Sequence, residues 1–193
     1  KKVVKTVQQQ GAKAAYQKVM NKLDSLTPLG YSMAGIVEAV GEGAEEFQVG
    51  QRVACAGAGY ANHAEVNFVP KNLVVPVPDD VPLEEAAFST IGAIAMQGLR
   101  QAEMQLGETA CVIGLGLIGQ LLVQLLRAGG IHVIGIDLVD DRCQLAMQLG
   151  ADYAGSADDA VLQSTLARLT GGHGMDCIFL CAGGSSNKPV ELA

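Results

Sequence analysis

The chain has 193 residues, a length that allows one large domain or two small ones, each with a buried core. Hydrophobic residues make up 49%, charged residues 17%, and 24 glycines are present, which is typical of a soluble α/β protein and not of a disordered or fibrous one. The formal net charge of -7 argues against nucleic acid as a partner, because binding to a phosphate backbone draws on clustered Lys and Arg.

The longest apolar stretch, from Ala110 to Leu126, is interrupted by three glycines and by Gln120. A membrane-spanning helix needs about 20 consecutive apolar residues, so we expect no membrane span. The chain opens at Lys1 without Met and stops at Ala193 where a helical pattern begins, and we therefore expect it to be a fragment of a longer protein.

Five cysteines are present, an odd number with no CxxC pair, and at least three of them lie in apolar runs. This usage is typical of reduced, buried thiols and predicts a cytoplasmic protein. The five are Cys55, Cys111, Cys143, Cys177 and Cys181.

Residues 1–27 differ from the rest of the chain, with six lysines against one Asp and apolar residues at roughly helical spacing. Gly11 is expected to split the segment into two helices. One interpretation is a basic amphipathic helix for a membrane surface or an anionic ligand. We favour a helical insert or extension with a solvated lysine face, because the apolar stripe is rich in Ala and has no large aromatic anchor.

From Leu29 to Val77 the pattern changes to short β-branched runs bounded by Gly and Pro, which predicts a small antiparallel barrel. The expected strands are Ala34 to Val40, Arg52 to Cys55, His63 to Val69 and Leu73 to Val77. Helices are then expected from Leu83 to Phe88, where Pro and acids favour a helix start, and from about Gly92 to Glu103.

After Gly107 buried strands alternate with helices that end in glycine. A β-α-β-α-β-α-β series predicts a doubly wound parallel sheet, of which the last strands lie outside this chain. The expected strands are Cys111 to Gly114, His132 to Asp137, a short one near Tyr153, and Met175 to Cys181, and the expected helices are Gln120 to Ala128, Arg142 to Leu149 and Ala160 to Leu169.

A GxGxxG motif, Gly114 to Gly119, lies where the first of these strands turns into a helix. Gly114 permits the tight turn, Gly116 lets the backbone approach a pyrophosphate, and Gly119 lets helix and strand pack closely. The N–H groups around Leu117 and Ile118, at the positive end of the helix, are expected to face the phosphates.

Asp137 ends the next strand, where an acidic residue accepts hydrogen bonds from the adenosine ribose of a bound dinucleotide. Such a charge-assisted bond contributes roughly 1.5–3 kcal/mol. A 2′-phosphate would meet a like charge here, so the sequence predicts NAD as cofactor and disfavours NADP. Arg142 is expected either to flank the adenine or ribose edge or to be a solvated residue of the first helical turn.

Several further motifs, taken in order, resemble the medium-chain dehydrogenase/reductase family over about residues 28–193. They are Gly30 to Gly41 with Val37, Phe47 to Val53, Gly59 to Val66, Leu106 to Thr109 leading into the glycine motif, Gly172 to Asp176, and Cys181 to Gly184. The resemblance implies a partial GroES-like substrate domain over 28–103 and a Rossmann domain over 104–193. It implies hydride transfer between nicotinamide and an alcohol, carbonyl or enone substrate in the cleft between them, with Cys181 and Ala182 beside the cofactor.

The chain departs from the zinc-dependent members of this family. Those members carry Gly-His-Glu where this chain has Gly30-Tyr31-Ser32, and an acid or Cys near Thr90. Zinc needs three or four converging ligands, which His63 and Cys55 do not supply, so we expect no metal. The matching positions then make Tyr31, Ser32 and Thr90 the candidate hydrogen-bond donors to the substrate oxygen. Each of these side chains could instead be satisfied locally.

Other classes of protein remain as alternatives. A Rossmann-like methyltransferase fits less well, because the strand before Gly114 carries no acid and the third glycine falls at Gly119. Short-chain dehydrogenases use a GxxxGxG turn and a YxxxK pair, and neither occurs. A non-catalytic NAD-binding sensor stays open, since the glycine motif reports binding and not turnover. The expected partner is a small-molecule alcohol or carbonyl substrate. The sequence does not fix the oligomeric state, and the family resemblance is compatible with a homodimer of the full-length protein.

Overall fold

The computed structural model describes residues 28–158, 160–184 and 187–193, together with four residues of the first 27. Of these four, Lys13, Tyr16 and Met20 are helical, and Gly11 has a positive φ of 82°. The helical extension expected over 1–27 otherwise lies outside the described residues.

The first half of the chain forms a three-stranded antiparallel sheet. Its strands are β1 (Ser32–Ile36), β2 (Arg52–Ala56) and β3 (Val74–Pro76), in the order β1-β2-β3, and a short 3-10 helix, η1 (Lys71–Leu73), precedes β3. Val53, Cys55 and Ala61 form a buried cluster on one side of β2, and Ala54 packs with Val77 and Ala86 on the other. Burial on both sides explains why β2 reads as a continuous apolar run.

The strand expected from His63 to Val69 is wrong, because these residues form bends and loop. The side chain of Asn67 closes the loop: its Oδ1 accepts a hydrogen bond from the Asn62 N–H at 3.2 Å, and its Nδ2 donates to the Asn62 carbonyl at 3.2 Å. A side-chain amide bonded to nearby backbone offers an alternative to a sheet ladder. The local apolar pattern was therefore not enough to make a strand.

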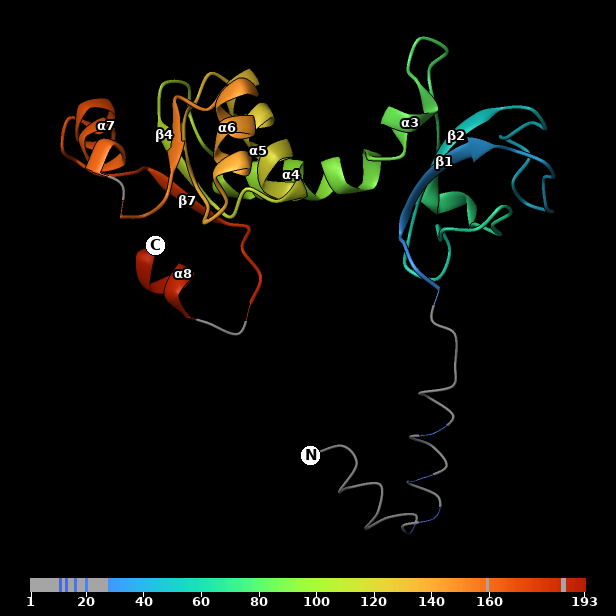
Figure 1. Ribbon diagram of the computed structural model, residues 1–193. Coiled ribbons are helices and arrows are strands. Elements are labelled where there is room, and N and C mark those ends of the chain that lie inside the picture. Colours follow the sequence, from blue (N-terminus) through green and yellow to red (C-terminus); the bar gives the residue numbers. More distant parts are fainter. Residues whose placement is uncertain are drawn as a thin grey trace.

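Two helices follow, α3 (Leu83–Ala86) and α4 (Ser89–Ala102). Pro82 caps α3, and Glu84 and Glu85 lie in its first turn, where acids are favourable near the helix N-terminus. The second helix begins at Ser89, three residues before the expected start. Figure 1 shows α4 running from the antiparallel sheet to the parallel one, so this helix is the link between the two.

The second half forms a parallel sheet in the order β6-β5-β4-β7, as a doubly wound fold requires. Its strands are β4 (Thr109–Ile113), β5 (His132–Ile136), β6 (Tyr153–Gly155) and β7 (Cys177–Leu180), each parallel to its neighbours. The first strand, β4, lies between β5 and β7. The chain direction across the sheet therefore reverses at β4, which is where ligands bind in open α/β sheets.

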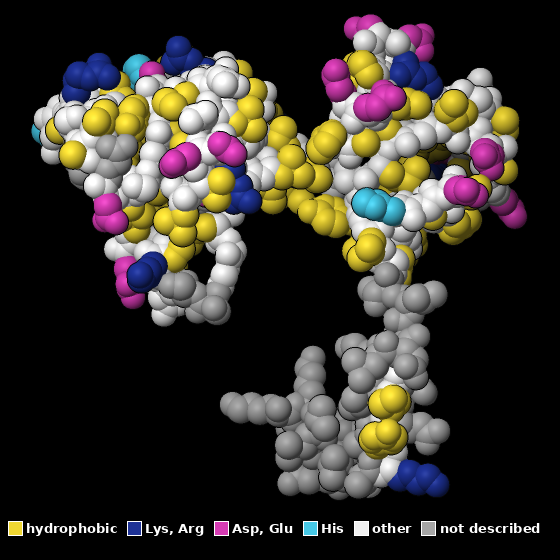
Figure 2. All heavy atoms as spheres, viewed as in Figure 1, with side chains coloured by type: hydrophobic (Ala, Val, Ile, Leu, Met, Phe, Trp, Pro, Cys, Tyr) yellow, Lys and Arg dark blue, Asp and Glu magenta, His cyan; other side chains and the backbone are white. Residues whose placement is uncertain are grey.

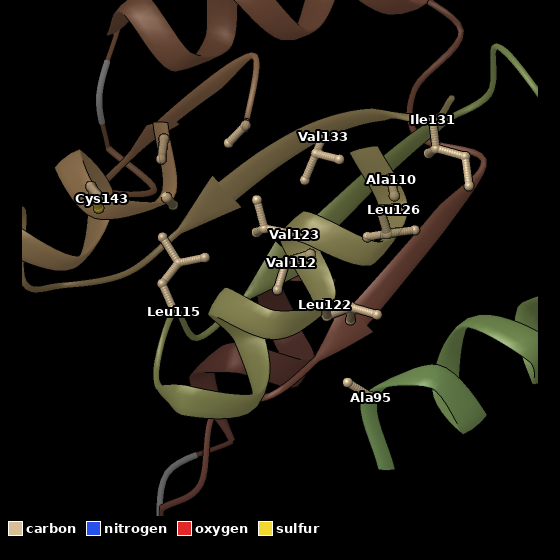
Figure 3. Close-up of a cluster of buried hydrophobic side chains, with 13 residues drawn as sticks. Ala95, Ala110, Val112, Leu115, Leu122, Val123, Leu126, Ile131, Val133 and Cys143 are labelled. Carbon is tan, nitrogen blue, oxygen red and sulfur yellow. The ribbon is translucent and has the colours of Figure 1, made fainter. Parts of the chain in front are cut away.

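Helices cover both faces of this sheet. They are α5 (Leu117–Ala128), α6 (Asp140–Gln148) and α7 (Ala160–Thr170), with α8 (Lys188–Leu192) following β7. Ala110 and Val112 of β4 face a core shared with α5 and α6, shown in Figure 3, whereas Cys111 and Ile113 face a second core with Leu162 of α7. Alternate residues of one strand thus fill two cores, and the predicted doubly wound architecture is confirmed.

Among the described residues, no helix combines the length and apolar character that crossing a bilayer requires. On the face shown in Figure 2, basic side chains form separate groups and no continuous patch, in keeping with the net charge of -7. Hydrophobic side chains gather over α4 between the two sheets.

Candidate functional site

The turn between β4 and α5 is built so that two of its glycines admit no side chain. Gly114 has a positive φ of 97°, and a Cβ placed on it would lie 2.5 Å from the backbone nitrogen of Ala182. A Cβ on Gly119 would lie 2.1 Å from the carbonyl oxygen of Gly114. Such distances are far inside van der Waals contact, so both positions need glycine for packing within the protein itself.

Gly116 differs from its neighbours because a Cβ there would meet no atom within 4 Å. It is the N-cap of α5, with φ -73° and ψ -165°, a conformation open to any residue. The protein's own packing therefore does not explain this glycine. It leaves bare backbone at the start of a 12-residue helix, where the N–H groups of Leu117 and Ile118 have no acceptor within the helix. An anion placed against this turn would meet those N–H groups and the positive end of the helix dipole.

Asp137 follows β5 directly and lies beside the same turn. Its Oδ2 accepts a hydrogen bond from the Leu115 N–H at 2.7 Å, and its Oδ1 accepts one from the Val139 N–H at 3.0 Å. The carboxylate side chain is only 8% exposed, and Arg142 Nη1 lies 3.6 Å from Oδ2. The Arg142 side chain is 53% exposed. The carboxylate thus already bonds the backbone of the turn, and the half-exposed arginine lies beside it.

The end of β7 completes this edge of the sheet. The Cys181 N–H donates to the carbonyl of Ile113 at 2.8 Å, and Ala182 packs against Gly114. Burial raises the pKa of the Cys181 thiol, which favours its neutral form. The glycine turn, Asp137, Cys181 and Ala182 therefore meet at the carboxyl ends of three neighbouring strands.

Gln120 belongs to this assembly, although the sequence showed it only as a polar break in an apolar run. Its Nε2 donates to the Leu115 carbonyl at 3.1 Å and to the Arg142 carbonyl at 2.8 Å. The residue is 8% exposed. The only signal in the sequence was a polar residue among the apolar residues of the first helical turn, and it does not reveal the hydrogen-bond partners.

The three candidate donors of the substrate side lie around the antiparallel sheet. Ser32 Oγ donates to the Ala87 carbonyl at 2.5 Å, and Thr90 Oγ1 donates to the Cys55 carbonyl at 3.4 Å. Both hydroxyl protons are thus engaged with backbone. Tyr31 is 42% exposed, and within the described part of the chain no hydrogen bond is recorded for its phenol.

The residues here do not form a set of zinc ligands. His63 packs its ring against Gly30, where a Cβ would lie 2.5 Å from the His63 Cδ2, and Cys55 is buried in β2 with its pKa raised by burial. Within the described ranges, no three His, Cys, Asp or Glu side chains converge as metal ligands would. The described residues therefore offer no converging set of zinc ligands.

Two family models match the chain. The model for the alcohol dehydrogenase GroES-like domain matches residues 4–79, and the model for the zinc-binding dehydrogenase matches residues 118–191. Both describe parts of one class of enzyme, in the same order as the two sheets.

Curated and solved relatives agree with these matches. A (R,R)-butanediol dehydrogenase from Neisseria gonorrhoeae is 29% identical over 191 residues, covering 84% of this chain and 53% of the relative. A mycobacterial protein solved with NADPH is 29% identical, with a TM-score of 0.69 over 91% of this chain and 56% of that one. An alcohol dehydrogenase from Escherichia coli solved with NADH is 27% identical, with a TM-score of 0.70 over 86% and 57%. The chain thus spans about half the length of the relatives it matches.

Proposed function

Because the chain belongs to the medium-chain dehydrogenase/reductase family, we propose that it binds NAD(H) and transfers a hydride between nicotinamide and an alcohol, carbonyl or enone substrate without zinc. The observation that carries the proposal is the open backbone at Gly116, since a Cβ there would meet only the space in which a diphosphate would lie. The amides of Leu117 and Ile118 would hold the diphosphate, with Gly114 and Gly119 fixing the shape of the turn.

Asp137 supports NAD over NADP. Its nearly buried carboxylate would accept hydrogen bonds from the adenosine ribose and would repel a 2′-phosphate. Arg142 weakens that repulsion, because its guanidinium lies 3.6 Å from the carboxylate and is half exposed. Relatives of this chain have been solved with each cofactor, so the preference has to be measured.

The bound nicotinamide supplies or accepts the hydride, and the protein orients the reactants and polarises the carbonyl. Tyr31 is the best placed of the three candidate donors to a developing oxyanion, because it is 42% exposed and its phenol has no hydrogen bond to another described residue. Ser32 and Thr90 would have to release the carbonyls of Ala87 and Cys55 before donating to a substrate. Cys181 and Ala182 would form the wall of the cofactor site at the end of β7.

The absence of zinc is proposed from residue types. Tyr31, Ser32 and Thr90 take the positions of the family's ligands, and none of them is a common zinc ligand. A catalytic contribution from the hydrogen-bond donors alone then replaces Lewis-acid assistance.

A non-catalytic NAD sensor is the second candidate, and one observation favours it. The hydroxyls of Ser32 and Thr90 both donate to backbone carbonyls, so Tyr31 is the one candidate of the three with no hydrogen bond among the described residues. A sensor would keep the glycine turn and Asp137 and would need no proton donor.

We propose the same division into domains that the sequence predicts. Residues 28–103 would form the substrate-side unit and residues 104–193 the nucleotide-binding unit, with 1–27 as an extension. We also propose a cytoplasmic location, from the reduced and buried cysteines, and a homodimer of the full-length protein, from the family resemblance.

The test is a titration of the protein with NADH and NADPH, followed by a panel of alcohols, aldehydes, ketones and enones and by metal analysis. We expect saturable binding with NADH tighter than NADPH, and oxidation of NADH by at least one carbonyl compound. Tighter NADPH binding would refute the role of Asp137, and stoichiometric zinc would refute the metal-free site. Binding without turnover of any substrate would select the sensor.

A further inference from the structure

Leu115 lies between the first two glycines of the motif. Its backbone N–H and its backbone carbonyl are both hydrogen-bonded to side chains. Its N–H donates to Asp137 Oδ2 at 2.7 Å, and its carbonyl accepts from Gln120 Nε2 at 3.1 Å. The residue is 1% exposed, and its side chain lies in the core that contains residues of α5 and α6, as Figure 3 shows. This residue therefore has little freedom to rotate while both partners are in place.

The same two partners also meet at Arg142. Gln120 donates its second amide hydrogen to the Arg142 carbonyl at 2.8 Å, and Asp137 faces the Arg142 guanidinium at 3.6 Å. Leu115, Gln120, Arg142 and Asp137 thus form a closed ring of contacts, which we call the Leu115 ring. It joins the glycine turn, the first turn of α5, the first turn of α6 and the end of β5.

Gln120 is placed in the ring as a donor only. Its two Nε2 contacts are both to carbonyl oxygens, which fixes the orientation of the amide, and Oε1 is buried without a hydrogen-bond partner in the described part of the chain. A buried acceptor without a partner disfavours folding. The contribution of this side chain therefore lies in what its two donated bonds hold in place.

We infer that Gln120 is a positioning residue for the dinucleotide site, acting through the Leu115 carbonyl and the Arg142 backbone. The inference rests on the proposed binding of a dinucleotide at Gly116. With Gln120 in place, the backbone that leads into Gly116 is ordered before the ligand binds. The entropy cost of ordering this turn therefore does not reduce the binding affinity. The same bonds keep the first turn of α6, and with it Arg142, at a set distance from the glycine turn.

The test compares Gln120→Met with Gln124→Met, using ADP-ribose as the probe and calorimetric titration as the measurement. Met keeps the length of the side chain and removes both donated bonds. Gln124 lies one turn further along α5 and is exposed; its Nε2 donates to the Gln120 backbone carbonyl at 3.2 Å, so Gln124→Met removes that bond but none of the contacts that make up the ring. We expect the Kd for ADP-ribose to rise about tenfold in Gln120→Met, equal to about 1.4 kcal/mol, and to stay within twofold of wild type in Gln124→Met.

A second variant, Gln120→Glu, distinguishes positioning from a general loss of structure. A carboxylate would face two carbonyl oxygens and donate nothing, whereas the protonated acid donates one bond. Burial against two carbonyl oxygens disfavours the charged form and raises the pKa of the introduced acid above its ordinary value. We therefore expect its Kd for ADP-ribose to rise relative to wild type as the pH increases from 6 to 9. The thermal unfolding of each variant is recorded under the same conditions, and Kd is measured where the protein is folded.

The outcomes separate the two claims. If wild type binds ADP-ribose and both Gln120 variants bind it equally well while melting at lower temperature, Gln120 is only structural and the inference is overturned. If wild type fails to bind ADP-ribose at all, the proposed function itself fails, and the inference falls with it.

Discussion

Gly116 and Gly119 belong to one turn, and a methyl group added to each would meet different surroundings. At Gly119 it would collide with the Gly114 carbonyl oxygen at 2.1 Å, and at Gly116 it would meet nothing within 4 Å. The packing of the protein thus requires glycine at 119 but not at 116, and the proposed function assigns the open space at Gly116 to the diphosphate of the cofactor.

Gly116→Ala therefore should separate binding from folding. We expect the affinity for NADH to fall at least tenfold, because the methyl group fills the space of the diphosphate, while the melting temperature stays close to that of wild type. Gly119→Ala is the matched variant, and its free energy of unfolding should fall by about 1–3 kcal/mol through overpacking. Fluorescence titration and urea unfolding measure the two effects. Unchanged NADH affinity in Gly116→Ala would contradict the account.

Asp137→Asn tests the preference between cofactors. The amide removes the negative charge, so we expect NADH affinity to fall about 10- to 100-fold, as the loss of a charge-assisted bond of roughly 1.5–3 kcal/mol implies. NADPH affinity should fall less or rise. The control is Asp140→Asn, an exposed acid in the first turn of α6. Equal losses for the two cofactors would show that Asp137 only holds the turn.

For single residues, the sequence predicted the backbone conformation of the glycine motif correctly. It did not predict hydrogen bonds between side chains and residues distant in the sequence. The spacing of Gly114, Gly116 and Gly119 predicted a strand-to-helix turn, and the structure confirms that turn. Gln120 and Ser32 could not be interpreted in the same way. Their partners, the Arg142 carbonyl and the Ala87 carbonyl, lie 22 and 55 residues away along the chain.

Elements buried on both faces were the easiest to predict. All five residues of β4 are buried, and its apolar run predicted a central parallel strand. The segment from His63 to Val69 had a similar β-branched character, but in the structure it forms a loop closed by Asn67. Hydrophobic character predicts a strand only where no nearby side chain captures the backbone groups that the sheet would use.

Asn67→Ala tests the closure of this loop. The variant loses the bonds to the Asn62 backbone, and we expect the free energy of unfolding to fall by about 1–3 kcal/mol. The dinucleotide affinity should be unchanged, since the loop belongs to the antiparallel sheet. Urea unfolding of Asn67→Ala and of the exposed Asn72→Ala provides the comparison. An equal loss in both variants would show that the Asn67 bonds add nothing.

Over the whole molecule, the doubly wound order was predictable from the alternation of strands and helices, but the role of α4 was not. This helix contacts β1 and β2 of the antiparallel sheet and also packs on α5, so it belongs to both halves. The spacing of apolar residues predicts how an element packs on one core. A helix that packs on two cores has apolar residues on two faces, and its pattern is therefore mixed.

The buried cysteines make the free energy of unfolding depend on pH in the alkaline range. Burial raises the pKa of Cys111 from its ordinary value of 9.0 to about 12, so the unfolded chain releases this proton first. The stability contributed by the neutral thiol is therefore complete below pH 9 and is lost as the pH rises toward 12. We expect the difference in unfolding free energy between wild type and Cys111→Ala to shrink over that range. Parallel curves for the two proteins would contradict the assignment.

The most direct test of the central claim is a crystal structure of the protein soaked with NADH. We expect the diphosphate to lie against Gly116 within hydrogen-bond distance of the amides of Leu117 and Ile118, and the adenosine ribose to contact Asp137. A turn that stays empty at saturating NADH, or a dinucleotide bound elsewhere on the molecule, would contradict the assignment of this site.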